Sequence, residues 1–149
     1  MAKKKPKTHP IWCCACDTEV AATLTNGAKV YPSRSDLMHV PFWICGGCGN
    51  FVGTHHRDQN PEKRLRPLGV IATPEIKRVR KMIHRILDPL WRPEGGYPRR
   101  LLYATIAKRM GWPEYHTAEL RSVEDAQAVF QVVKDIKQHG LADEAETVF

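Results

Sequence analysis

The clearest periodic pattern lies in the second half of the chain. Apolar residues from Ile76 to Leu90 recur every three or four positions, which predicts an amphipathic helix. The preceding Thr73-Pro74-Glu75 suits a helix start, with an N-cap, a proline in the first turn and an acid near the positive end of the dipole. Pro89 is expected to end or bend this helix. Its polar face carries Lys77, Arg78, Lys81 and Arg85.

Two further helices are predicted after the Gly95-Gly96 break. One runs from Arg99 to Met110, where Gly111 supplies a stop signal. The other begins after Ser122, which with Asp125 three positions on resembles a capping box, and it ends near Gly140. The buried stripe expected for this last helix is Ala126, Val129, Phe130, Val133 and Ile136.

The first half of the chain shows short alternating segments instead. Val20 to Leu24 and Ala28 to Tyr31 flank Asn26-Gly27, a dipeptide that favours a tight β-hairpin. Val40 to Ile44 and Phe51-Val52 are the other strand candidates. Three or four short antiparallel strands are therefore expected here. The fold class is α+β, with these strands packed with a C-terminal segment of about three helices.

These patterns divide the chain into four parts. We expect residues 1–10 to form a mobile basic arm, 11–66 a strand-rich ribbon with a basic loop, which the cysteines described next identify as a zinc ribbon, 67–142 a helical segment and 143–149 an acidic tail.

Two cysteine pairs, Cys13-x-x-Cys16 and Cys45-Gly-Gly-Cys48, supply the ribbon's chemistry. Four thiolates in two such pairs are the ligand set of a structural, tetrahedral Zn²⁺ site. A closed shell of four sulfurs leaves no position for a reactive water, so the metal is expected to stabilise the fold. Disulfides or a redox motif are the alternatives, but no βαβ pattern surrounds either pair. Cys14 remains a spare thiol.

Charge is concentrated in the middle of the chain. The formal net charge is +7 and the pI about 9.3. Nine Lys or Arg residues lie between Arg57 and Arg85 against three acids, whereas acids outnumber bases after Leu101. Such clustering favours a polyanionic partner, nucleic acid above all, with a solvated helix face as the plainer explanation.

Histidines are the only candidates for catalysis. His84 with Asp88 could form a base and its orienting carboxylate, but their spacing of four also fits a local pair on one helix. His55, His56 and Asp58 have the residue types of a second metal site, and such groupings in a loop are common by chance.

Aromatic residues beside the cysteines could stack on unpaired bases or cover the metal. Packing is the favoured role of Trp43, within a predicted strand, whereas Trp12 beside the basic arm is the better stacking candidate. Trp91 and Trp112, near prolines at helix ends, look structural.

Several motifs together resemble a family of small zinc-finger-containing proteins of bacteriophages and prophages. They are Phe51-Val52-Gly53-Thr54-His55, Pro67-Leu68-Gly69, His84 followed by Asp88-Pro89-Leu90-Trp91, and the stretch from Tyr103 to Gly111. His116 to Leu120 matches only loosely. The resemblance implies a phage origin and supplies no activity.

These observations lead to three hypotheses. The first is a non-enzymatic, zinc-stabilised nucleic-acid-binding protein of the cytoplasm, without a membrane partner. The second is an adaptor that binds a host protein through the last helix and acidic tail, and the third is a hydrolase or nuclease using His55 or His84. The nucleic-acid-binding residues of the first hypothesis are Lys3, Lys4, Lys5, Trp12, Arg57, Lys63, Arg64, Arg66, Lys77, Arg78, Lys81 and Arg85.

Overall fold

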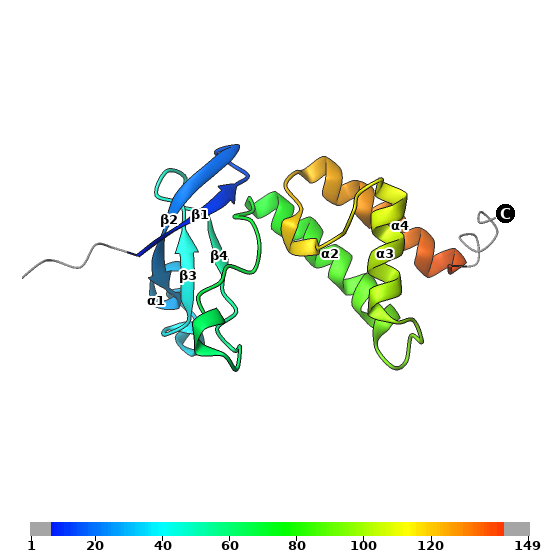
Figure 1. Cartoon of the computed structure of the whole chain (residues 1–149), viewed down its shortest axis with the longest axis horizontal. Helices are drawn as coiled ribbons and strands as arrows, with labels where there is room; N and C mark the ends of the chain where they lie inside the picture. The colour runs from blue at the N-terminus through cyan, green and yellow to red at the C-terminus, as the bar shows by residue number, and fades with distance from the viewer. Residues whose placement is uncertain (1–6, 142–149) are drawn as a thin grey trace, which may run out of the picture. The chain divides into compact units, whose positions relative to one another are not determined.

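The computed structural model describes residues 7–141, which form two compact units (Figure 1). The first ends at Thr73 and the second begins at Pro74. Lys3, Lys4, Lys5 and the predicted acidic tail lie outside the described residues. The predicted α+β class is confirmed, with one antiparallel sheet and four helices in the described part.

The first unit, called here the zinc unit, is built on a four-stranded antiparallel sheet in the order β1-β2-β3-β4. The strands are β1 (Thr8–Cys13), β2 (Thr18–Asn26), β3 (Pro41–Ile44) and β4 (Phe51–Gly53). Thr8 to Pro10, assigned from the sequence to the basic arm, belong instead to β1 and pair with Ala21 to Thr23. This backbone pairing outweighs the polar composition of the segment.

The predicted hairpin at Asn26-Gly27 is wrong. Helix α1 (Gly27–Val30) follows β2 directly, and the Asn26 side chain caps it by accepting a hydrogen bond from the Lys29 N–H at 3.2 Å. Asparagine favours both tight turns and N-caps, so the dipeptide alone did not decide between them. A Cβ on Gly27 would lie 1.8 Å from the Leu37 carbonyl oxygen, which explains the glycine. Strand β2 pairs with β3 across this insertion.

One face of the sheet holds the core of the zinc unit. Ile11, Trp43 and Val52 lie on it, and Ile71 and Leu65 pack against them from the segment that follows β4. Trp43 is 2% exposed, and its indole N–H donates to the Leu65 carbonyl at 2.7 Å, so the packing role predicted for it is confirmed. Two 3-10 helices, Ser35–Leu37 and Pro61–Lys63, lie in the loops.

The second unit, called here the helical unit, contains α2 (Pro74–Trp91), α3 (Arg99–Met110) and α4 (Val123–His139), with a 3-10 helix at Thr117–Glu119. Helix α2 begins at Pro74 as expected and continues two residues beyond Pro89. The bounds predicted for α3 are confirmed, and so is the cap of α4, where the Asp125 N–H donates to Ser122 Oγ.

The three helices share one apolar core. Its residues include Ile83 and Leu87 from α2, and the fully buried apolar positions of α3 and α4 are Leu102, Ile106, Ala126, Val129, Val133 and Ile136. Arg80 ties α2 to the loop before α4, since its guanidinium donates to the carbonyls of Ala118 and Leu120 at 2.9 and 2.8 Å. Within the described residues, no helix is long and apolar enough to cross a membrane.

Candidate metal centre

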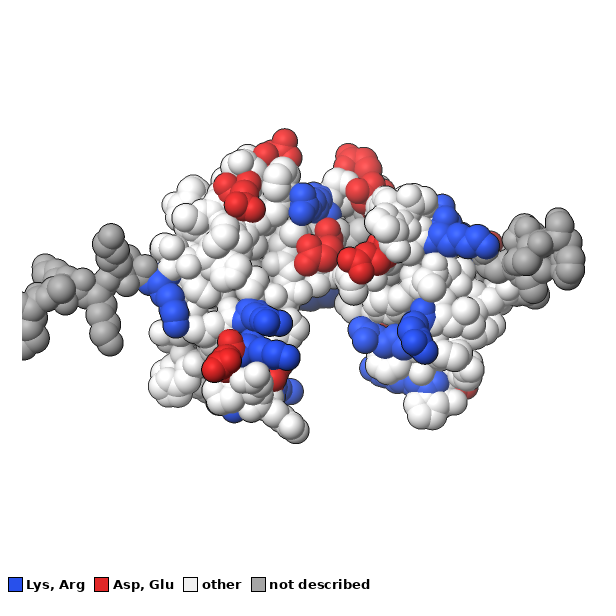
Figure 2. Space-filling view, in the orientation of Figure 1, with Lys and Arg blue, Asp and Glu red and all other residues white. Residues whose placement is uncertain are grey.

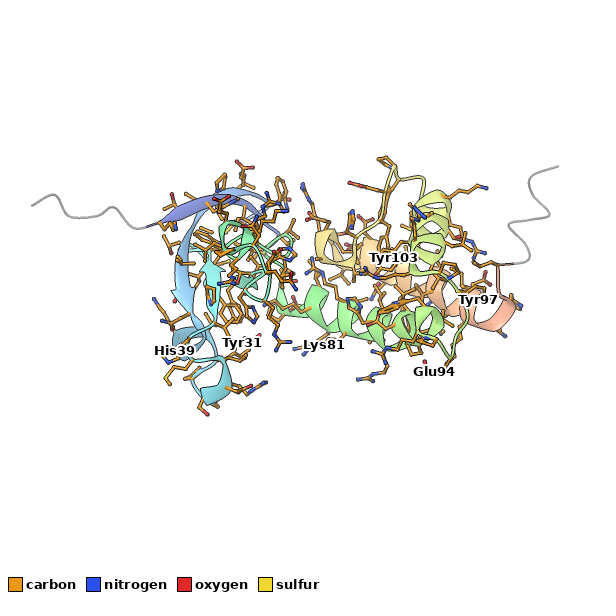
Figure 3. All side chains as sticks on the ribbon, turned by 60° about the horizontal axis from the view of Figure 1, so that its bottom comes forward. Tyr31, His39, Lys81, Glu94, Tyr97 and Tyr103 are labelled. Atoms are coloured by element: carbon orange, nitrogen blue, oxygen red, sulfur yellow. The ribbon has the colours of Figure 1, made fainter. Side chains whose placement is uncertain are left out.

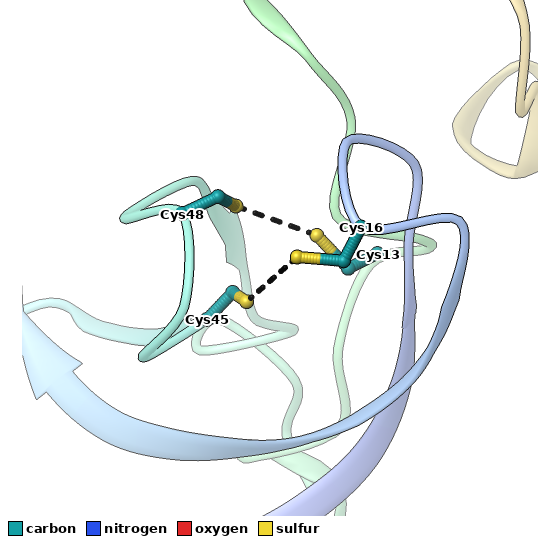
Figure 4. Close-up of side chains that lie close together, drawn as sticks. All are labelled: Cys13, Cys16, Cys45 and Cys48. Carbon is teal, nitrogen blue, oxygen red and sulfur yellow. Dashed lines mark hydrogen bonds between the residues drawn. The ribbon is translucent and has the colours of Figure 1, made fainter.

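Two turns of the zinc unit bring four cysteines together (Figure 4). Cys13 ends β1 and Cys16 lies in the turn before β2, while Cys45 follows β3 and Cys48 lies in the turn before β4. Antiparallel pairing of the strands places these two turns at the same end of the sheet, so that residues distant in sequence converge. The turns are the two C-x-x-C motifs found in the sequence.

The sulfur geometry fits a zinc ion. All four Sγ atoms lie within 4.8 Å of one another. The Cys13–Cys48 and Cys16–Cys45 sulfurs are 3.5 and 3.8 Å apart. A tetrahedral zinc ion with Zn–S bonds of about 2.3 Å requires sulfurs about 3.8 Å apart. None of the five cysteines forms a disulfide, so the disulfide alternative is wrong in this structure.

Backbone geometry is similar in the two turns. The residue after the second cysteine has a positive φ in each, 55° at Asp17 and 80° at Gly49. In the second turn the Gly49 N–H donates to the Cys45 carbonyl at 2.9 Å, and the Asn50 N–H points to Cys48 Sγ at 3.5 Å. N–H groups directed at sulfur favour the thiolate form that a metal needs. Glycine adopts a positive φ readily, so Gly49 is the ordinary residue type for such a turn, whereas Asp17 is not.

The sulfurs differ in their affinity for protons. Burial raises the pKa of the Cys13 thiol, and hydrogen bonds to Cys13 and Cys45 raise the pKa of Cys16 to about 12. Burial also opposes ionisation of Cys45, but hydrogen bonds led by the backbone N–H groups of Cys48 and Gly47 lower its pKa to about 7. Because zinc binds thiolates, its uptake must displace the protons that Cys13 and Cys16 hold at neutral pH.

Cys14 is not part of the cluster. Its backbone N–H donates to the Ile71 carbonyl at 2.9 Å, and the Ile71 N–H returns a bond to the Trp12 carbonyl at 2.8 Å. The segment around Ile71 therefore runs beside the end of β1 and braces the first C-x-x-C turn. Sequence reasoning missed this support, because a short apolar run such as Val70 to Ala72 carries no information about which strand it will pair with.

The comparison with known families agrees with this geometry. The model of a zinc-finger-containing domain, DUF3268, matches residues 9–137. The chain belongs to this family. The match spans both units, so the helices are part of the family's domain as much as the cysteine turns are. No curated protein and no solved structure matches the chain. The phage origin implied by the resemblance stays a prediction.

The other predicted sites are dispersed. Among residues 7–141, the four cysteines are the only group of metal-ligating side chains gathered closely enough to hold an ion, so His55, His56 and Asp58 form no such site. His84 Nδ1 lies 3.1 Å from Asp88 Oδ1, and the Trp91 indole donates to that same oxygen at 3.2 Å. The His84–Asp88 pair is thus a local contact within α2, one of the two interpretations the sequence offered.

Proposed function

We propose that this zinc-finger protein binds nucleic acid through exposed basic surfaces, with zinc as a structural ion and without chemistry on the bound strand. The observation that carries the proposal is a stripe of cations on α2. Arg78, Lys81 and Arg85 are exposed and spaced by three and four residues, so they share one side of the helix. Within residues 7–141, none of their side chains makes a hydrogen bond or an ion pair in the structure.

Electrostatic crowding on α2 favours an anionic partner. Desolvation, followed by the charges of Arg80 and Lys81, lowers the pKa of Lys77. The smaller, charge-based part of this shift is repulsion of the Lys77 ammonium by Arg80 and Lys81, and nearby phosphates would relieve it. The Arg80 guanidinium, in contrast to the stripe, binds backbone carbonyls of its own unit.

The zinc unit carries a second group of cations in the loop after β4. Arg57, Lys63 and Arg66 are exposed there, while the Arg64 side chain donates to the Asp58 carbonyl at 2.8 Å. Lys and Arg side chains are visible on the surfaces of both units in Figure 2. Because phosphate contacts are additive and insensitive to sequence, two such groups support affinity more than base selectivity.

Trp12 lies on the sheet face opposite the zinc unit's core. It alternates along β1 with the buried residues Ile11 and Cys13, and it is half-buried. An indole at such a position supports the base-stacking role proposed for it, which is worth about 1–3 kcal/mol per base where stacking occurs.

The adaptor hypothesis has one supporting observation of its own. Val79, Met82 and Phe130 border a shallow groove between α2 and α4, and Met82 is 44% exposed. Exposed methionine is frequent at protein-binding surfaces. The acidic tail that the hypothesis also invokes lies outside the described residues.

Fluorescence anisotropy with labelled single-stranded DNA, duplex DNA and RNA over a salt series tests the proposal. Binding should weaken steeply with salt, by a slope of about 0.9 per phosphate contact on duplex DNA. The double variant R78E/K81E should bind more weakly, and the slope should fall by the contribution of about two phosphate contacts. The control R92E/K137E makes the same charge change at exposed sites outside the stripe and should bind like the parent protein.

Absence of binding to every probe at low salt contradicts the proposal, as does unchanged binding by R78E/K81E. If nucleic acid does not bind and a host protein is retained on the groove beside Met82, the adaptor function replaces it.

A further inference from the structure

A pocket of about 760 Å³ lies within the helical unit, formed by α3 and the chain that follows it. None of the residues that line it belongs to the metal centre or to the α2 stripe. They combine cations with aromatic rings. The side chains that decide its chemistry are Arg100, Tyr103, Ala104, Lys108, Trp112 and Tyr115. Its volume is within the usual range for small-molecule sites in proteins.

The end of α3 creates the pocket. Gly111 has a φ of 73°, and the chain turns back there because the Gly111 and Trp112 N–H groups bond the carbonyls of Lys108 and Ala107 at 3.1 and 2.9 Å. This pair of bonds is a Schellman motif, which ends the helix and reverses the direction of the chain, so that the residues that follow run back beside α3. Trp112 and Tyr115 thereby form a wall beside α3. Ala104 and Ala107 on α3 are small enough to leave space in front of that wall.

The wall is aromatic and held in place. The rings of Trp112 and Tyr115 are stacked at 6.4 Å with an interplanar angle of 16°, and Tyr103 meets Tyr115 at 5.3 Å. Tyr115 is 3% exposed, and its hydroxyl bonds the Thr117 hydroxyl at 2.8 Å. Trp112 and Tyr103 are only half-buried, so part of each ring remains accessible to a ligand. Figure 3 labels Tyr103 on α3.

Cations surround the rings. The Arg99 guanidinium lies 4.7 Å from the centre of the Tyr103 ring and donates to its hydroxyl at 3.3 Å. Arg100 and Lys108 are exposed two turns apart on α3, and within the described residues the Arg100 side chain has no hydrogen-bond or ion-pair partner. The one acid among the lining residues, Glu114, lies 3.4 Å from His116. The lining is therefore net positive.

We propose that this pocket binds one nucleotide, with its base against Trp112 or Tyr103 and its phosphate between Arg100 and Lys108. A planar ring and an anion within one small molecule match an aromatic wall bordered by cations. The inference rests on the proposed function, because a single strand supplies unpaired nucleotides and a duplex does not. A free nucleotide offers the same chemistry, and the experiment separates these two sources.

The first arm titrates the zinc-loaded full chain with adenosine 5′-monophosphate, adenosine and inorganic phosphate, following the Trp112 indole N–H by NMR. The monophosphate should shift this signal and bind more tightly than either fragment. R100A should weaken the monophosphate about tenfold, the usual effect of losing one charge-assisted hydrogen bond. The control R92A removes an exposed arginine outside the pocket and should leave the affinity unchanged.

A second variant keeps the test independent of charge. A104L adds a good helix-forming side chain at an exposed position and fills the pocket, so the fold should persist while the monophosphate loses its site. No shift of the Trp112 signal by the monophosphate overturns the proposal. Equal binding by A104L and the parent chain also overturns it.

The second arm compares single-stranded and duplex oligonucleotides. A104L should reduce the affinity for a single strand and leave duplex binding intact, whereas R78E/K81E should weaken both. If oligonucleotides bind but the monophosphate does not, the pocket proposal alone fails. If the monophosphate binds in the pocket and no oligonucleotide binds, the pocket stands with a free nucleotide as its ligand, and the proposed function fails.

Discussion

The two units are stabilised by different means. The buried cluster of the zinc unit has seven residues, two of which are cysteines of the metal centre, whereas the cluster of the helical unit has eleven and no metal ligand. Small domains bury too little apolar surface to be stable by packing alone and often need a metal or a disulfide. The zinc unit is such a case, since its core ends at the sulfurs. The helical unit depends on ordinary packing of three helices.

Removal of the metal should have the largest effect, because it should destabilise the zinc unit and leave the helical unit folded. Structural zinc contributes about 10–16 kcal/mol to the folding of finger peptides, so chelation should unfold the zinc unit. Amide hydrogen exchange should then show rapid exchange in β1 to β4 and retained protection in α2 and α4. Loss of protection in both units at the same chelator concentration would show that the helices depend on the metal.

Single cysteine substitutions make the same comparison genetically. C45S removes a ligand and should reproduce the chelated state, while C14S is a matched control because the Cys14 sulfur lies outside the cluster. Zinc content measured by mass spectrometry should fall in C45S and stay at one ion per chain in C14S. Equal zinc loss in both variants would place Cys14 in the ligand set.

A cavity in the helical core should have the converse effect. Leu87 is fully buried, and L87A should cost about 2–5 kcal/mol in the free energy of unfolding of the helical unit. Zinc content and the exchange protection of the β-sheet should be unchanged. Denaturant unfolding followed by the helical circular dichroism signal measures the loss. Release of zinc by L87A would show that the two units fold as one.

Crowding in the loop after β2 should have a smaller effect, confined to the zinc unit. G27A forces a Cβ onto the Leu37 carbonyl, and overpacking of this kind costs about 1–3 kcal/mol. The control is G46A, because a Cβ there meets nothing within 4 Å. Thermal unfolding of the zinc-loaded protein should separate the two variants. Equal stability would mean that the α1 loop shifts without cost.

Alkaline pH should weaken the helical unit slightly. Burial raises the pKa of Tyr115 above its ordinary value. Above about pH 10 the unfolded chain loses this proton while the folded chain keeps it, so stability falls by about 1.4 kcal/mol per pH unit. The stability of Y115F should lack this dependence on pH, although the variant also loses the Thr117 hydrogen bond at every pH.

Denaturant unfolding of the parent protein and Y115F between about pH 9 and 11 tests this linkage. The stability difference between them should change in favour of Y115F as the pH rises. Y31F, at an exposed tyrosine of the zinc unit, is the control and should follow the parent. A pH-independent difference between Y115F and the parent would contradict the expected linkage.

Local signals in the sequence predicted much of this structure. The C-x-x-C pairs identified the cysteines that converge, Gly111 marked the end of α3, and Ser122 marked the start of α4. These features depend on residues close together in sequence, or on a ligand spacing that chemistry fixes.

Long-range contacts account for what could not be predicted. Asn26-Gly27 forms a cap and not a hairpin turn because the chain near Leu37 packs on Gly27, and no local pattern records that contact. The pocket beside α3 was missed for the same reason. Trp112 looked like a structural residue at a helix end, and only the return of the chain at Gly111 brings it into the lining of a pocket that Arg100 also borders.

X-ray absorption at the zinc edge tests the central claim most directly, that Cys13, Cys16, Cys45 and Cys48 hold one zinc ion. The spectrum of the purified, reduced protein should fit four sulfur neighbours at about 2.3 Å and no nitrogen or oxygen ligand. Fewer than four sulfurs, or a histidine in the coordination shell, would contradict this account of the metal centre.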